Sequence, residues 1–124
     1  MSSLPAPRGV LIVDDQAPFR SVARTLVRML RGWQVVGEAD SGERAVALAG
    51  ELAPDLVLMD INLPGINGIE ATRSILQARP DTLVLLLSTY AAEDLPRDAM
   101  DCGATGYVRK DDLTPQVLRG LVER

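Results

Sequence analysis

Several oxygen-bearing side chains and one lysine stand directly after apolar runs of the sequence. Asp14 and Asp15 follow one run, and Asp60 closes another. Ser88 ends a third run, and Lys110 follows a short run nearer the C-terminal end. Carboxylates, a hydroxyl and an amine together could bind a divalent cation and an oxyanion such as a phosphoryl group. They can act together only if the fold brings them to one place.

Carboxylates that lie close together need a positive partner. Three of them within about 5 Å would repel one another by roughly 3 kcal/mol per pair at an effective dielectric constant near 20. A divalent cation offsets that repulsion, and an all-oxygen, histidine-free site suits Mg²⁺. Lys110 adds a second positive charge, and Ser88 offers a hydroxyl to a phosphoryl oxygen. Each acid taken singly is typical of a solvated turn, whereas the whole set predicts a site.

The composition excludes several other kinds of chemistry. The 124 residues include no histidine, so there is no Ser-His-Asp triad, Cys-His pair or His-ligated zinc. One cysteine cannot form an intrachain disulfide, which suits the reducing cytoplasm. The net charge of −4 excludes a strongly basic nucleic-acid surface. Because no apolar run approaches membrane-spanning length, we expect a cytoplasmic protein without a membrane partner.

Apolar runs of strand length alternate with segments of helical period. Strands are expected at residues 9–14, 33–39, 55–60, 82–88 and 106–109. Helices are expected between Pro18 and Gly32, from a cap at Ser41 to Pro54, from Asn67-Gly68 to Pro80, from about Pro96 to Cys102, and around Leu113 to Leu121. Phe19, Val22, Leu26, Met29 and Leu30 are expected on the inner face of the first helix, and Met100 is also expected in the core.

Strict alternation of five strands and five helices predicts a single α/β domain, a parallel sheet with helices on both faces. Right-handed crossovers favour the flavodoxin-like strand order 2-1-3-4-5. We expect residues 1–7 to be a flexible tail and residues 8–124 to form the domain. In such sheets function gathers at the carboxyl ends of the strands. That strand order would bring Asp14, Asp15, Asp60, Ser88 and Lys110 to one patch of surface.

The residues at these strand ends resemble the signature of response-regulator receiver domains. The matching segments are Val13-Asp14-Asp15, LMDINLPG at 58–65, Leu86-Leu87-Ser88 and GYVRK at 106–110. They occur in the expected order and spacing, and the resemblance covers about residues 8 to 124. Residues 68–73 and 102–107 are most similar to the NarL/FixJ branch. Members of that branch usually continue into a LuxR-type helix-turn-helix domain that binds DNA.

The resemblance implies that Asp60 is a phosphoacceptor, which takes a phosphoryl group from a histidine of a partner sensor kinase. Mg²⁺ would be bound by Asp15, Asp60 and the backbone carbonyl of Asn62, with Asp14 near the ion or bound to it through water. Ser88 and Lys110 would bind the phosphoryl oxygens.

The resemblance also implies a switch. Ser88 and Tyr107 would respond to phosphorylation and change a surface that controls an output, namely transcription. The chain would form a homodimer on activation and reach DNA only through a further C-terminal domain. It would not be an enzyme, apart from taking part in its own phosphorylation and slow self-dephosphorylation.

Two side chains are expected to gate hydrolysis of the aspartyl phosphate. Asn62, two residues after the acceptor, has no charge with which to draw a proton from water. Tyr90, two residues after Ser88, would bring a bulky neutral ring to the mouth of the site. We therefore expect slow loss of the phosphoryl group. Pro96 disfavours helix at the residue before it, so residues 89–95 are expected to form a long loop beside the site.

Two other classes of protein share part of this pattern. A haloacid-dehalogenase-like phosphatase also forms an aspartyl phosphate, and Asp60-Ile61-Asn62 half-resembles its Asp-x-Asp motif, but Asn62 cannot act as a general acid. A flavodoxin-like cofactor binder would need a loop rich in Ser, Thr and Gly after the first strand, where Asp14 and Asp15 would repel phosphate. Turnover of a small phosphoester would indicate the first class, and a yellow preparation the second.

Overall fold

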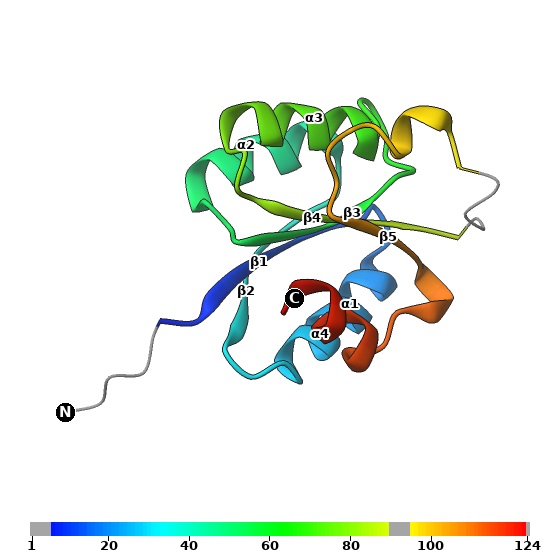
Figure 1. Ribbon diagram of the computed structural model, residues 1–124. Helices are drawn as coiled ribbons and strands as arrows, with labels where there is room; N and C mark the ends of the chain where they lie inside the picture. Colours follow the sequence, from blue (N-terminus) through cyan, green and yellow to red (C-terminus); the bar gives the residue numbers. More distant parts are fainter. Residues whose placement is uncertain (1–5, 90–94, 124) are drawn as a thin grey trace.

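A five-stranded parallel sheet forms the centre of the molecule (Figure 1). The computed structural model describes residues 6–89 and 95–123. The strand order is β2-β1-β3-β4-β5, which confirms the predicted flavodoxin-like order. The strands are β1 (Arg8–Val13), β2 (Trp33–Ala39), β3 (Leu56–Asp60), β4 (Leu83–Ser88) and β5 (Gly106–Arg109). Each lies within one residue of its predicted bounds.

Helices cover both faces of the sheet, as predicted. Helices α2 (Gly42–Leu52) and α3 (Gly68–Ala78) lie on one face, and α1 (Ala17–Arg28) and α4 (Pro115–Val122) lie on the other (Figure 1). Two short 3-10 helices, η2 (Arg97–Ala99) and η3 (Lys110–Asp112), flank β5 along the chain. No helix among the described residues is long and apolar enough to cross a membrane.

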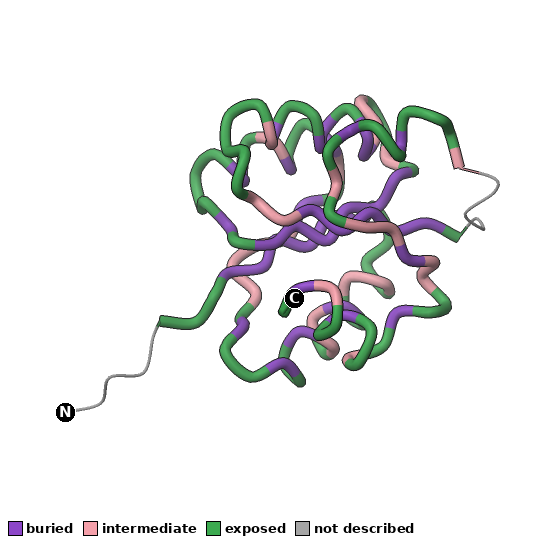
Figure 2. Tube along the Cα trace, viewed as in Figure 1, coloured by how far each residue is buried: buried purple, intermediate pink, exposed green. Residues whose placement is uncertain are grey.

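The core is built from aliphatic side chains of the central strands. Every residue of β3 is buried, as are the last five residues of β1 and of β4 (Figure 2). Strands buried on both faces need continuous apolar runs, and these runs are what the sequence contains. The sheet separates two apolar clusters, one beneath α2 and α3 and one beneath α1 and α4.

Side-chain caps begin three of the helices. Ser41, Asn67 and Thr114 each accept a hydrogen bond from the backbone N–H three residues later. These bonds satisfy donors that the first helical turn leaves without partners. The cap at Ser41 and the helix opening at Asn67-Gly68 were both predicted.

The fourth predicted helix is not an α-helix. Between Pro96 and Cys102 the described residues form only the 3-10 helix η2, so four α-helices are described instead of five. Pro96 keeps an extended ψ of 146° and has no N–H. Gly103 takes a φ of +95°, which ends any helix before it. The interval between these residues is short, so few helical hydrogen bonds could offset the unfavourable free energy of nucleating an α-helix.

Three predicted core residues lie at the surface. Val22 is 52% exposed, Met29 is 56% exposed and Met100 is 75% exposed. The buried face of α1 instead carries Ala23 and Val27, and the helix ends at Arg28. Met29 therefore lies beyond the last helical turn. Met100 directly follows η2, which buries only Ala99.

The predicted tail and the predicted loop fall partly outside the described residues. Residues 1–5 of the tail are not described, and Ala6 and Pro7 are exposed. Most of the loop at 89–95, including Tyr90, also lies outside the described residues.

Candidate metal and phosphorylation site

Three carboxylates meet at the carboxyl edge of the sheet. Val13 pairs with Met59 across β1 and β3, so Asp14, the residue after β1, lies beside Asp60, the last residue of β3. One carboxylate oxygen from each of Asp14, Asp15 and Asp60 lies within 4.8 Å of the other two. The predicted convergence of these acids is therefore confirmed.

Backbone N–H groups hold two of these carboxylates in place. Gln16 N donates to Asp14 Oδ1 at 2.8 Å, and Asn62 N donates to Asp60 Oδ1 at 3.2 Å. Asp14 is fully buried and Asp60 is 3% exposed, whereas Asp15 faces solvent. The site thus has two fixed inner acids and one outer acid open to a ligand.

Lys110 points its ammonium group into this cluster. It begins η3, directly after β5, and its Nζ lies 2.6 Å from Asp14 Oδ2 and 3.5 Å from Asp60 Oδ2. Its side chain is 10% exposed. The same Nζ lies 4.6 Å from the centroid of the Phe19 ring, a cation–π contact from α1. Sequence reasoning treated Phe19 only as a core residue, because nothing in the local pattern links it to Lys110.

The pKa of the Asp60 carboxyl is raised from 3.8 to about 6, first by burial and second by the neighbouring charge of Asp14. Lys110 and the N–H of Asn62 act in the opposite direction and limit the shift. The site therefore holds an acid whose ionised form is costly without additional positive charge.

The residues fit a divalent cation. One lysine faces three carboxylates, so the ionised cluster keeps an excess of negative charge. The buried Asp14 Oδ2 makes its ion pair with Lys110 but accepts no hydrogen bond. All the donors are oxygens, and hard cations with oxygen ligands are favoured by such a set.

The remaining predicted residues lie around the same edge. Asp60 pairs with Leu87 across β3 and β4, so the buried Ser88 is the next residue beyond it. Ser88 in turn pairs with Arg109, the residue before Lys110. Asn62 is exposed, two residues after Asp60.

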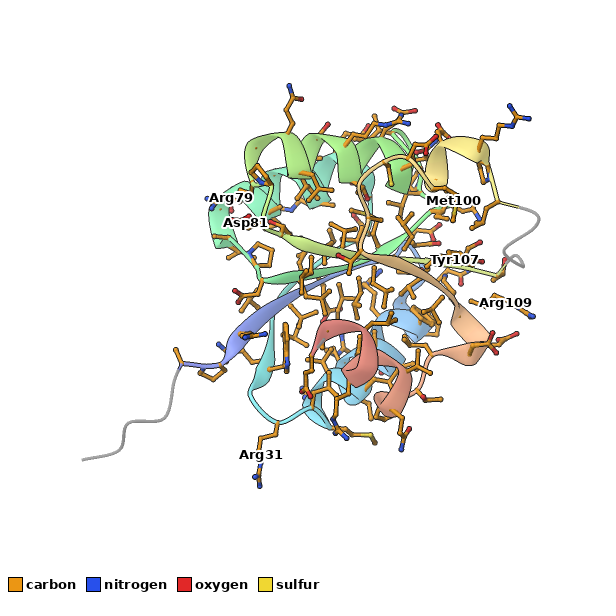
Figure 3. All side chains as sticks on the ribbon, viewed as in Figure 1. Arg31, Arg79, Asp81, Met100, Tyr107 and Arg109 are labelled. Carbon is orange, nitrogen blue, oxygen red and sulfur yellow. The ribbon has the colours of Figure 1, made fainter. Side chains whose placement is uncertain are left out.

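Tyr107 is half-buried on β5, on the side of Met100 (Figure 3). These two residues line a small pocket of about 150 Å³ beside η2. Tyr107 pairs with Leu86 of β4, and β4 lies between the strand of Tyr107 and the strand of Asp60.

Arg20 is a further residue of the site that sequence reasoning missed. Its Nη1 donates to the carbonyl oxygen of Asp14 at 2.8 Å, and its Nε lies 3.3 Å from Glu38 Oε1. Glu38 also receives two hydrogen bonds from Arg24. Arg20 therefore ties the acidic loop to α1 and β2. The only sequence signal was a basic residue spaced six positions from an acid, which is common on any surface helix.

The family is shown by comparison with known proteins. Residues 10–123 match the response regulator receiver domain. The chain therefore belongs to the family of response-regulator receiver domains, as its fold and its acidic pocket indicate. This is a family of signal receivers and not of phosphatases or flavin-binding proteins.

Individual relatives place the chain within this family. It is 44% identical over 101 residues to the response regulator GacA of Pseudomonas aeruginosa, a match that covers 82% of this chain and 47% of GacA. It is 38% identical over 112 residues to the response regulator UvrY of Escherichia coli K12, covering 90% of this chain and 51% of UvrY. These relatives are NarL/FixJ-family regulators, the branch that the sequence resembles. The chain spans about half the length of the curated relatives it matches.

Solved structures of response regulators have the same fold as this chain. A LuxR-family response regulator from Aurantimonas sp. SI85-9A1 is 33% identical with a TM-score of 0.84, covering 95% of this chain and 86% of that one. The receiver domain of NarL from Mycobacterium tuberculosis is 30% identical with the same TM-score, covering 97% of this chain and 100% of that one.

Proposed function

We propose that this receiver domain is phosphorylated on Asp60 by a partner histidine kinase. The observation that carries the proposal is the geometry at Asp60: a carboxylate 3% exposed, within 4.8 Å of two other acids and 3.5 Å from the Lys110 ammonium. A carboxylate nucleophile needs its charge and a positive group for the incoming phosphoryl oxygens. This site provides both.

In the proposed transfer, the P–N bond of the kinase's phosphohistidine breaks and a P–O bond to an Asp60 carboxylate oxygen forms. The freed imidazole remains a side chain of the kinase, and the donor histidine has to belong to the kinase because this chain has none. Lys110 and the Ser88 hydroxyl would bind phosphoryl oxygens. Lys110 would then exchange part of its interaction with Asp14 and Asp60 for one with the new phosphate.

We assign Mg²⁺ to the acidic cluster. Asp15, Asp60 and the backbone carbonyl of Asn62 would bind it, with Asp14 near the ion or bound through water. When bound, Mg²⁺ would neutralise charge on the carboxylates and on the phosphoryl oxygens. Asp15 is suited to recruit it, because it is the exposed acid of the cluster.

The proposed output is a change of surface near β5. If Ser88 shifts toward the phosphate, Tyr107 can turn inward and alter the surface around η2, β5 and α4. We propose that this change favours a homodimer and controls a C-terminal DNA-binding domain, so that the whole regulator acts on transcription in the cytoplasm. Support comes from the relatives, which include the transcriptional regulatory protein DegU of Brevibacillus brevis.

The gate formed by Asn62 and Tyr90 stays a prediction, since Tyr90 lies outside the described residues.

Phosphorylation by a small donor tests the proposal. Wild-type protein incubated with Mg²⁺ and acetyl phosphate should gain one phosphoryl group, located at Asp60 by mass spectrometry. Asp60→Asn should gain none, and Lys110→Ala should react about tenfold more slowly or worse, because it lacks the positive charge. Asp40→Asn is the matched control, since Asp40 is an exposed acid after β2 that is not part of the cluster. Undiminished labelling of Asp60→Asn would show that another residue is the nucleophile.

A further inference from the structure

The segment between β3 and α3, residues 61–67, carries part of the proposed metal site. Hydrogen bonds fix both of its ends. Asn62 N donates to Asp60 Oδ1 at 3.2 Å, and Gly68 N donates to the carbonyl oxygen of Ile61 at 2.9 Å. A side chain from another element fixes the middle of the segment. Ile66 N donates to Glu43 Oε2 at 3.1 Å, so a side chain from the first turn of α2 holds this segment.

The carboxylate of Glu43 rests directly on the turn at Gly65. Gly65 has a φ of +75°, a conformation that favours glycine. A methyl group added to Gly65 would collide with both carboxylate oxygens of Glu43. The absence of a side chain at Gly65 thus makes room for Glu43 to reach the N–H of Ile66.

Backbone contacts continue from this turn to Asp60. A methyl group added to Gly42, the first residue of α2, would collide with the carbonyl oxygen of Ile66. A methyl group added to Gly68 would collide with the carbonyl oxygen of Asp60. The N-terminal end of α2 therefore packs on the Gly65-Ile66 turn. The start of α3, which follows this turn, packs on the backbone of Asp60.

Helix α2, which carries Glu43, is itself fixed by a cap and by packing on the sheet. Ser41 caps it by accepting from Arg44 N, and Ala45, Leu48 and Ala49 are buried against the sheet. Glu43 itself is exposed, so its hydrogen bond competes with water. We therefore expect it to adjust the site by a moderate factor and not to decide whether the site exists.

We propose that Glu43 is a positioning residue for the metal and phosphoryl site, holding the 62–66 segment so that the Asn62 carbonyl faces the ion. The inference rests on the function proposed above, which assigns that carbonyl to Mg²⁺. Glu43 touches neither the acids nor the phosphoryl group. It acts through the backbone of the segment alone.

Three variants of the whole chain and one control test the role. Glu43→Ala removes the acceptor, and Glu43→Gln keeps an amide oxygen that can accept from Ile66 N. Gly65→Ala displaces the carboxylate by steric clash and also strains the turn, because its φ is +75°. Glu51→Ala is the control, because it removes the same charge from an exposed position of the same helix. Three readouts are compared: hydrogen exchange of the Ile66 amide without metal, the Mg²⁺ dissociation constant from an NMR titration, and the rate of phosphorylation by acetyl phosphate.

In Glu43→Ala and Gly65→Ala the Ile66 amide should exchange faster in the metal-free protein, and Mg²⁺ should bind about three- to tenfold more weakly. Phosphorylation should slow at limiting Mg²⁺ and approach the wild-type rate at saturating Mg²⁺. Glu43→Gln should recover most of the wild-type behaviour, and Glu51→Ala should match wild type. Combining Glu43→Ala with Gly65→Ala should weaken Mg²⁺ binding by less than the product of the single effects, because both lose the Glu43 contact and only the strain at Gly65 is additional.

Two results would overturn the inference, and they are distinguishable from a failure of the proposed function. Unchanged Mg²⁺ affinity in Glu43→Ala, with faster exchange at Ile66, would show that the contact holds the segment but does not position the site. Equal losses in Glu43→Gln and Glu43→Ala would show that charge matters and the hydrogen bond does not. A wild-type chain that neither binds Mg²⁺ nor accepts a phosphoryl group would instead refute the function itself.

Discussion

At the scale of single residues, the burial of Asp60 makes its ionised form electrostatically costly. Its pKa is about 6 in the folded protein and 3.8 in the unfolded chain, mainly because it is buried and secondly because Asp14 lies close. Between these values the folded state binds more protons than the unfolded state. The contribution of Asp60 to stability is therefore greatest below pH 3.8 and is lost as the pH rises through 6. At neutral pH the ionised form costs the fold about 3 kcal/mol.

Replacing Asp60 should remove that cost. Without divalent cations, Asp60→Asn should be more stable than wild type at pH 7.5, by up to about 3 kcal/mol, and the advantage should shrink as the pH falls toward 4. Urea unfolding at a series of pH values measures it, with Asp40→Asn as the control for net charge. A stability difference that stays constant from pH 4.5 to 7.5 would contradict a raised pKa at Asp60.

Mg²⁺ should offset the same cost by binding the folded state. At a Mg²⁺ concentration ten times its dissociation constant, mass action adds about 1.4 kcal/mol to the free energy of unfolding. The gain should be larger at pH 7.5 than at pH 5, because Asp60 must lose its proton. Asp15→Asn should abolish most of the gain, yet leave the metal-free melting temperature nearly unchanged since Asp15 is exposed. A wild-type melting curve that millimolar Mg²⁺ does not move would refute the assigned site.

At the scale of elements, two glycines in helices test different effects. One position has no room for a side chain, and the other has room, so that only helix propensity matters there. Gly68 begins α3, and an added methyl group would collide with the carbonyl oxygen of Asp60. Gly50 lies in α2 with no atom within 4 Å of an added methyl group. The two residues therefore make opposite predictions for the same substitution.

Gly68→Ala should destabilise the fold by about 1–3 kcal/mol, because the backbone of α3 must move away from β3. Gly50→Ala should stabilise it by up to about 1 kcal/mol, because alanine restricts the unfolded chain and suits a helix. Urea unfolding of both variants beside wild type measures the pair. Gly68→Ala as stable as Gly50→Ala would mean that α3 does not pack against Asp60 as closely as described.

At the scale of the whole molecule, the strand order separates the site from one edge of the sheet. Strands β4 and β5 carry Ser88, Tyr107 and the approach to Lys110, whereas β2 with Trp33 forms the opposite edge. Asp14 and Asp60 lie between them, after β1 and β3. Ser88 and Lys110 lie at the same edge as the acids, so we expect a change that begins at Asp60 to reach β4 and β5 through them.

Phosphorylation should accordingly alter one side of the domain. Amide hydrogen exchange should change within residues 88–112 and remain nearly constant within residues 33–53. Trp33 fluorescence should respond weakly for the same reason. Unphosphorylatable Asp60→Asn, treated with the same donor, is the control. Changes confined to residues 33–53 would refute a switch through Ser88 and Tyr107.

The sequence alone determined the five strands, four of the helices and the types of side chain that gather at the carboxyl edge of the sheet. Apolar runs that end in Asp14, Asp60 and Ser88 predict buried parallel strands, and parallel strands place their carboxyl ends at one edge. Local signals such as the cap at Ser41 also placed helix starts. These features depend on neighbours in the chain, so composition and period were enough.

Tertiary packing decided the rest. Apolar spacing predicted Val22 to be inside, but the way α1 docks on the sheet buried Ala23 and Val27 instead. Phe19 against Lys110 and Glu43 on Ile66 join residues far apart in sequence. No local pattern encodes such contacts, because they exist only once separate elements are packed at particular distances and angles.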